Sequence, residues 1–144
     1  MNKPSQTQAR GVGQTQAVGF NVGARRTFGL VPEQAWDWVT SPAGVALWLG
    51  EVIGGLPQEL HAPYRTRDGA EGELRVFEPG SHLRLTWQPS GWERPSLIQV
   101  RVLPAGDRTT VAFHQEHLAG PDIRAEMKQR WLGVLAEMQA LFGA

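Results

Sequence analysis

The chain has 144 residues, 41% of them hydrophobic, and its 14 Lys and Arg residues balance 14 Asp and Glu residues. This size fits one globular domain with a sizeable core, and the balanced charge argues against nucleic acid or an anionic membrane as the main partner. The absence of cysteine excludes disulfides, thiolate metal sites and cysteine nucleophiles. No apolar run approaches the ~20 residues of a membrane span, and the N-terminus lacks the apolar core of a signal peptide. We therefore expect no membrane insertion and a cytoplasmic protein.

The N-terminal part of the chain divides into a tail and the start of one domain. Residues 1–14 are polar and show no apolar periodicity, which predicts a flexible tail followed by a single domain over residues 15–144. Apolar side chains then occupy most even positions of the first strand: Val18, Phe20, Val22, Ala24 and Phe28. This alternation predicts a half-buried strand over residues 16–28. Arg26 interrupts its apolar side.

Two short helices are predicted after the first strand. Pro32 suits the first position of a helix, where its missing N–H group would have no partner in any case. Ser41 and Pro42 end this helix and begin a second one, which we place at residues 43–49. Two glycines and a proline within residues 54–57 then mark a loop.

Five further strands follow, with tight turns between them. Leu83, Leu85 and Trp87 alternate with polar neighbours, so one side of that strand faces a core and the other faces water. The turns combine glycine with aspartate or proline, residues that favour tight turns. The five strands are placed near residues 62–67, 71–78, 82–88, 96–103 and 109–116. Together with the first strand they predict a six-stranded antiparallel sheet.

A long amphipathic helix is predicted from Gly120 to Ala144. Its apolar residues recur at spacings of three and four and therefore share one face. They are Met127, Trp131, Val134, Leu135, Met138, Leu141 and Phe142. A single long helix after a run of antiparallel strands buries such a stripe only by lying across the sheet. The predicted fold class is therefore α+β, with the helix and the sheet gripping a cavity between them.

Three stretches of the sequence resemble a known family. Arg26-Thr27-Phe28 precedes Pro32-Glu33-Gln34-Ala35-Trp36, Thr40-Ser41-Pro42 precedes Trp48, and Arg108–Val111 leads to His117-Leu118 and Trp131. These stretches, within residues 16–142, resemble the bacterial family related to the activator of heat shock protein 90 ATPase. That family belongs to the START-like or SRPBCC superfamily, which includes the birch-pollen-allergen proteins, and the resemblance implies its helix-grip fold. Ala35 and Arg130 stand where this family more often has valine and glycine.

We expect this helix-grip protein to bind a small hydrophobic or amphipathic molecule without covalent chemistry, in a cavity between the sheet and the C-terminal helix. Arg26 is either a structural side chain at the sheet or a polar anchor for a ligand carboxylate or carbonyl. The expected lining residues are Arg26, Trp48, Tyr64, Phe77, Trp87, Val100, Phe113, Met127, Trp131 and Met138. The tryptophans either fill this cavity or line it, and the sequence leaves both readings open.

Two other functions stay open, because one fold hosts many functions. The first is a regulatory protein of the co-chaperone, stress-related type, acting on a protein partner or as a homodimer. The second is a cofactor-free enzyme of the cyclase or dehydratase type. The sequence contains no catalytic motif and no cofactor motif that we identify. We predict no metal site, because His114 and His117 would face opposite sides of a strand and no third ligand follows nearby.

Overall fold

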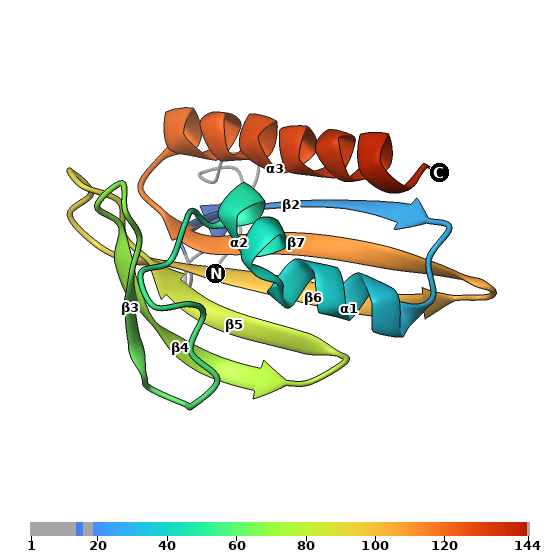
Figure 1. Cartoon of the computed structure of the whole chain (residues 1–144). Coiled ribbons are helices and arrows are strands. Elements are labelled where there is room, and N and C mark those ends of the chain that lie inside the picture. Colours follow the sequence, from blue (N-terminus) through green and yellow to red (C-terminus); the bar gives the residue numbers. More distant parts are fainter. Residues whose placement is uncertain (1–13, 16–18, 144) are drawn as a thin grey trace.

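The computed structural model describes residues 14–15 and 19–143 of the chain (Figure 1). The predicted N-terminal tail lies outside this part, except for Gln14, which belongs to the first strand. The elements in chain order are β1 (Gln14–Thr15), β2 (Gly19–Phe28), α1 (Pro32–Thr40), α2 (Pro42–Trp48), β3 (Pro63–Arg65), β4 (Glu71–Glu78), β5 (His82–Trp87), β6 (Ser96–Ala105), β7 (Arg108–Leu118) and α3 (Pro121–Phe142).

The strands form one sheet in the order β1-β2-β7-β6-β5-β4-β3, and each neighbouring pair is antiparallel. The helices α1, α2 and α3 lie on one face of this sheet, and α3 runs along β2 and β7 (Figure 1). This arrangement confirms the predicted α+β helix-grip fold. The described residues form seven strands rather than six, because Gln14 and Thr15 pair with Phe20 and Gly19 at the sheet edge. Two residues are too few for alternation to predict a strand.

The core lies between the sheet and the helices. Leu83, Val100 and Phe113, from three neighbouring strands, turn inward and are fully buried because alternate residues of a strand share one face. The stripe of α3 that covers them consists of Met127, Trp131, Val134, Leu135 and Met138, all buried. These five residues recur at spacings of three or four, as the sequence analysis predicts, so they lie on one face of the helix and pack together against the sheet.

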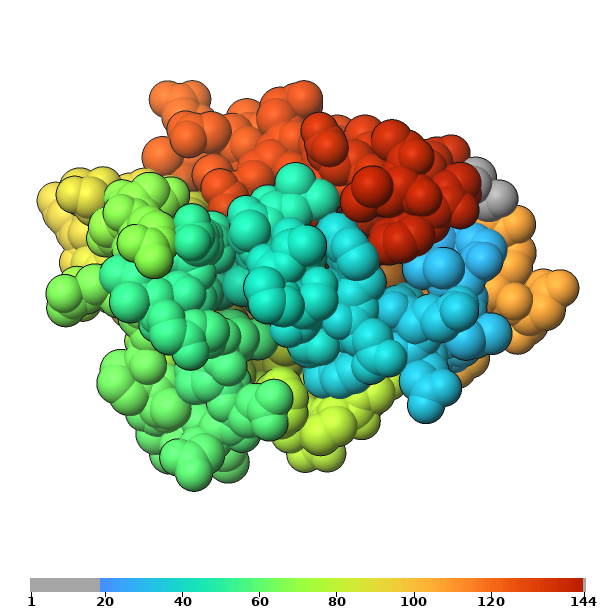
Figure 2. All heavy atoms as spheres, in the orientation of Figure 1, coloured from blue at the N-terminus to red at the C-terminus, as the bar shows by residue number. Residues whose placement is uncertain are grey.

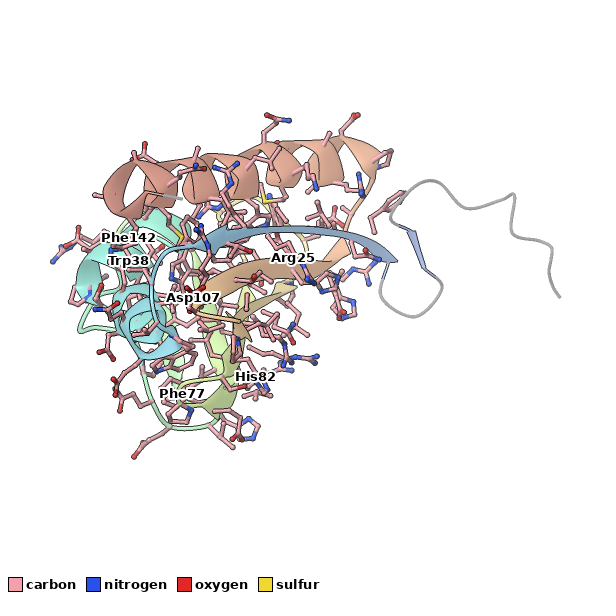
Figure 3. All side chains as sticks on the ribbon, turned by 90° about the vertical axis from the view of Figure 1, so that its right-hand side faces the viewer. Arg25, Trp38, Phe77, His82, Asp107 and Phe142 are labelled. Atoms are coloured by element: carbon pink, nitrogen blue, oxygen red, sulfur yellow. The ribbon has the colours of Figure 1, made fainter. Side chains whose placement is uncertain are left out.

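The last turn of α3 departs from the prediction. Leu141, expected on the buried face, is 62% exposed. The next residue, Phe142, packs against the domain instead. The centroid of its ring lies 5.4 Å from that of Trp38 and 6.5 Å from that of Phe28, both in edge-on geometry. Trp38 and Phe142 come together from α1 and α3 (Figure 3). Since Gly143 ends the helix next to this contact, no further turn continues the buried stripe.

Side-chain hydrogen bonds fix the junction between α1 and α2. The hydroxyl of Ser41 donates to the carbonyl of Trp38 at 2.6 Å and accepts the N–H group of Gly44 at 3.1 Å, so one residue closes α1 and caps α2. The indole of Trp48 donates to the carbonyl of Val39 at 2.8 Å. These bonds hold the two short helices in a fixed geometry beside the open pocket described below.

Candidate functional site

The residues predicted to line a central cavity pack against one another. The ring of Phe113 stacks on that of Trp131, with centroids 4.7 Å apart and planes 12° apart. The ring of Trp48 approaches Phe113 at 6.1 Å. Val100, Met127 and Met138 belong to the same buried cluster. These six predicted residues are therefore brought together, and in this structure they contribute to the packing between the sheet and α3.

A buried chain of hydrogen bonds crosses this core. The indole of Trp131 donates to Oε1 of Gln115 at 3.0 Å, and Nε2 of Gln115 donates to the hydroxyl of Ser96 at 2.9 Å. Ser96 in turn donates to the carbonyl of Trp87 at 2.9 Å. These hydrogen bonds link α3 to β7, β6 and β5. They give the side chains of Trp131, Gln115 and Ser96 the partners that buried polar groups need. Sequence reasoning did not single out Gln115, although it follows Val111 and Phe113 in the inward phase of its strand.

Arg26 is bound by the protein itself. Its Nη1 donates to Oε1 of Gln139 at 2.6 Å and to the carbonyl of Leu135 at 3.5 Å. Both partners belong to the C-terminal half of α3, so the guanidinium emerges from the apolar side of β2 beside the helix. This geometry supports the structural reading of Arg26, and it directs its guanidinium to partners within the fold rather than to an open pocket.

Tyr64 lies on β3, the edge strand at the end of the sheet order opposite to β1, and is buried. Its hydroxyl donates to the carbonyl of Thr86 at 2.5 Å, and its ring lies over Gly72 of the neighbouring strand. Burial raises the pKa of the Tyr64 phenol well above its ordinary value, because the phenolate would lose its hydration inside the protein.

Alkaline titration tests this placement directly, since Tyr64 is the only tyrosine in the chain. A raised pKa means that Tyr64 keeps its proton in the folded state and releases it on unfolding. Its contribution to stability is then complete below the pKa of the unfolded chain, about 10, and is lost as the pH rises further. We expect the phenolate absorbance to appear only together with the loss of tertiary circular dichroism. Ionisation of the phenol in a protein that is still folded would contradict this placement.

Trp87 and Arg130 form a second cluster near Tyr64. The guanidinium carbon of Arg130 lies 4.8 Å from the centroid of the Trp87 ring and 5.7 Å from that of Trp131. Nη2 of Arg130 donates to the carbonyl of Trp48, the last residue of α2, at 3.0 Å. Burial lowers the pKa of Arg130, and the negative charge of Asp68 opposes this effect. Nε of Arg130 and Nε1 of Trp87 are buried without an acceptor among the described residues.

An open pocket of about 270 Å³ lies between α2, the segment that follows it and β4. Figure 2 shows the face of the molecule on which α1, α2 and this segment lie. Phe77 is the one predicted site residue in its wall. The full lining comprises Thr40, Pro42, Val45, Glu51, Val52, Gly55, Leu56, Gln58 and Phe77. The lining combines apolar side chains with polar groups from the end of α1 and from residues 51–58.

A wider recess of about 700 Å³ lies where β2 begins and β7 ends. Its lining includes Glu93, Arg94 and His117 as well as the apolar residues Trp92 and Ile123. Gly19, the first residue of β2, also belongs to the lining. None of the residues predicted to bind a ligand contributes to this recess.

A model of the family described as Activator of Hsp90 ATPase homolog 1-like protein matches residues 30–143, from the entry into α1 to the end of α3. The chain belongs to this family. None of the curated proteins matches the sequence. Among the residues of this chain that the structure describes, no helix is long and apolar enough to cross a membrane.

Solved structures with the same architecture include proteins of several organisms. CalU16 from Micromonospora echinospora is 18% identical and superposes with a TM-score of 0.72 over 83% of this chain and 74% of its own. The HSP90 activator PFC0360w from Plasmodium falciparum is 12% identical, with a TM-score of 0.70 over 84% of this chain and 94% of its own. The Aha1 dimer from Colwellia psychrerythraea is 15% identical, with a TM-score of 0.70 over 85% and 96%. At these identities the likeness shows the fold alone.

Among the described residues, the two histidines near the end of β7 do not meet a third metal ligand. Nδ1 of His114 lies 3.6 Å from a carboxylate oxygen of Glu116 on the same strand. His117 adopts a left-handed backbone conformation with φ of 68° at the strand end. Across residues 14–15 and 19–143, no group of three His, Cys, Asp or Glu side chains is close enough together to hold a metal ion.

Proposed function

We propose that this protein binds a small, largely apolar molecule non-covalently in the pocket between α2, residues 51–58 and β4. The observation that carries this proposal is the pocket itself, whose volume of about 270 Å³ lies close to the lower end of the ~300–1,000 Å³ of small-molecule sites. Its apolar lining includes Val45, Val52, Leu56 and Phe77. The proposal keeps the ligand class expected from the sequence but moves the site away from the packed space under α3.

The polar rim of the pocket suggests the head group of the ligand. The carboxylate of Glu51 pairs with Arg67 at 2.9 Å and is exposed, so it also offers a lone pair at the pocket edge. The hydroxyl of Thr40 donates to the carbonyl of Trp36 at 2.8 Å, which leaves its oxygen as an acceptor. Two acceptors favour an amphipathic ligand with a hydroxyl or amine donor. An exposed ion pair lacks the desolvated acid or base that an enzyme of the cyclase or dehydratase type would need.

A filling substitution tests the pocket. N-phenyl-1-naphthylamine, a neutral fluorescent probe, is titrated into the protein and into Leu56→Trp, which places an indole in the pocket. We expect the probe to bind the parent saturably and the variant about tenfold or more weakly, a loss of ~1.4 kcal/mol. Leu60→Trp is the matched control, because Leu60 follows this segment by two residues and is 57% exposed but does not line the pocket.

The control decides how the result is interpreted. Equal binding to the parent, Leu56→Trp and Leu60→Trp would show that the probe occupies another site and would remove the pocket from the proposal. Circular dichroism of each variant checks that the indole has not unfolded the segment. Saturable binding that only Leu56→Trp weakens is the outcome that the proposal requires.

A regulatory protein that acts through its surface is the second candidate. Two observations favour it: the side chains between the sheet and α3 are closely packed, and Ile53 and Leu60 expose 53% and 57% of their surface beside the pocket. Two structures of the same fold are described as an HSP90 activator and as a dimer. On this reading the partner is a protein or a second copy of the chain, with a stress-related role. For both candidates we propose a cytoplasmic location.

A further inference from the structure

We propose that the side of the sheet opposite to the three helices is a docking surface for an acidic segment of a partner protein. Arg25, Arg84 and Arg101 form its basic centre, and we call these three residues the arginine face. Figure 3 shows the sheet from its side, with α1 and α2 at the left and the labelled Arg25 and His82 to the right of them. The arginine face shares no residue with the pocket between α2, residues 51–58 and β4, so the proposal does not depend on ligand binding there.

Strand pairing brings two of the arginines into one row. Arg25 of β2 lies opposite Ala112 of β7, and Ala112 lies opposite Arg101 of β6. Residues directly opposite in an antiparallel sheet share one face. Val100 and Val102, on either side of Arg101, are buried on the side of the helices, so the row faces away from them. Two strand spacings, roughly 10 Å, separate the backbones of Arg25 and Arg101.

Arg84 adds a third cation in the next row. It lies on β5 between the buried residues Leu83 and Leu85 and therefore points to the same outer side. Its partner across the strands is Gln99 of β6, to whose Oε1 its Nε donates at 2.8 Å. Gln99 is two residues from Arg101, so Arg84 and Arg101 are diagonal neighbours about 7–8 Å apart. The neutral amide orients Arg84 and leaves its charge uncompensated.

Acidic residues are scarce around these arginines. β2, β5 and β6 contain none, and β7 contains only Glu116, which lies 3.6 Å from Nδ1 of His114. Glu78 of β4 lies opposite His82, which separates it from Arg101 in the row. Within residues 14–15 and 19–143, none of the three arginines forms an ion pair. The arginine face therefore carries a positive charge that its surroundings do not neutralise.

Carboxylates of an extended peptide fit this arrangement. A guanidinium offers a carboxylate two parallel hydrogen bonds, which makes this pair one of the stronger polar contacts at a protein surface. Alternate side chains of an extended peptide are roughly 6.8 Å apart, which is comparable with the separations among the arginines. Ala112 has only a methyl group between Arg25 and Arg101, so an acidic side chain can lie between the two guanidinium groups.

Charge disfavours the other occupants. A second copy docked through the same face by two-fold symmetry would bring like arginines together. Residues 1–18 contain Lys3 and Arg10 and no acidic residue, so the N-terminal segment does not complement the face. Nucleic acid is attracted by a large excess of positive charge, whereas the 14 basic residues of the chain are balanced by 14 acidic ones.

A peptide titration followed by nuclear magnetic resonance tests the face. The probe is an N-acetylated octapeptide of alternating Ser and Asp, and its matched control carries Asn in place of Asp. We expect the acidic peptide to shift the amide resonances of Arg25, Arg84 and Arg101 saturably. In about 50 mM salt the Asn peptide should bind at least about tenfold more weakly, and the difference should shrink at about 300 mM because salt screens exposed charges.

Variants at one position separate charge from shape. Ala112→Glu places a carboxylate of the protein itself between Arg25 and Arg101 and should abolish the preference for the Asp peptide. Ala112→Gln has the same size without the charge and should keep that preference. Arg101→Gln should weaken the Asp peptide about threefold, the effect of one exposed ion pair. Arg67→Gln is the control for net charge, because Arg67 pairs with Glu51 beside the pocket; it should leave the affinity unchanged.

Each outcome decides the proposal. Equal binding of the two peptides, shifts confined to residues outside the arginine face, or a preference that survives Ala112→Glu would overturn it. An oligothymidylate of equal charge that binds more tightly than the acidic peptide would identify a nucleic-acid surface instead. If thermal melting shows that Ala112→Glu does not fold, unchanged affinity in Arg25→Gln and Arg101→Gln overturns the proposal. Leu56→Trp should leave peptide binding intact, so failure of the pocket and failure of this face are distinguishable.

Discussion

Replacing Trp131 by alanine should destabilise the protein more than any other single truncation on α3. The indole is fully buried, stacks on Phe113 at 4.7 Å and starts the hydrogen-bond chain through Gln115. Its removal leaves a large cavity and two broken contacts, which together cost about 3–5 kcal/mol. For a domain of this size the melting temperature should fall by roughly 10–20 °C. Thermal unfolding followed by circular dichroism measures the effect.

Trp131→Phe separates the two contributions. Phenylalanine keeps a ring against Phe113 but cannot donate to Gln115, whose buried oxygen then loses its partner at a cost of about 1–3 kcal/mol. We expect this variant to fall between the parent and Trp131→Ala. A Trp131→Ala variant that melts at the temperature of the parent would mean that α3 does not grip the sheet through this residue, and the architecture of the core would need revision.

Gly72→Ala should be the most damaging change that adds a single methyl group to the sheet. A Cβ atom at Gly72 would overlap the carbonyl of Thr86 and would press on the ring of Tyr64. Both are fixed, because the Tyr64 hydroxyl donates to that same carbonyl. The backbone of β4 would have to move away from β5, so we expect a loss of about 3 kcal/mol or more. Urea unfolding followed by tryptophan fluorescence measures the effect.

Gly133→Ala in α3 is the control, because we expect it to stabilise the protein rather than destabilise it. A Cβ atom at Gly133 would meet open space, and glycine in a helix interior is less stable than alanine by roughly 0.5–1 kcal/mol. Gly133→Ala should therefore raise the urea midpoint slightly. If Gly72→Ala and Gly133→Ala have similar effects, then Tyr64 and β5 do not confine Gly72 as described.

The sequence predicts most of this fold because its elements have long, clear periods. The stripe from Met127 to Met138 repeats every three or four residues, and the alternation in β5 and β6 identifies one wet and one dry side. Short elements escape this reasoning: β1 has two residues and shows no period. The exposure of Leu141 depends on where α3 ends relative to Trp38 and Phe28, and a helical pattern does not contain that information.

The candidate site is less predictable, because it depends on volumes and on contacts between distant segments. The sequence shows that Trp48, Phe113 and Trp131 face inward, but whether they fill a space or line it depends on how closely the sheet and α3 approach. Arg130 and Trp87 are 43 residues apart in the sequence, and no local sequence pattern predicts their contact. Gln115 is different: the inward phase of β7 predicts a buried amide there, and a buried amide requires partners.

The place where a neutral ligand binds tests the central claim most directly. Methyl resonances can be followed while N-phenyl-1-naphthylamine is added to protein with labelled Val, Leu and Met side chains. We expect saturable shifts at Val45, Val52 and Leu56, which line the open pocket. Val100 and Met138, buried between the sheet and α3, should not shift. Shifts confined to Val100 and Met138 would place the ligand under α3 and contradict the pocket, and an absence of saturable shifts would contradict ligand binding itself.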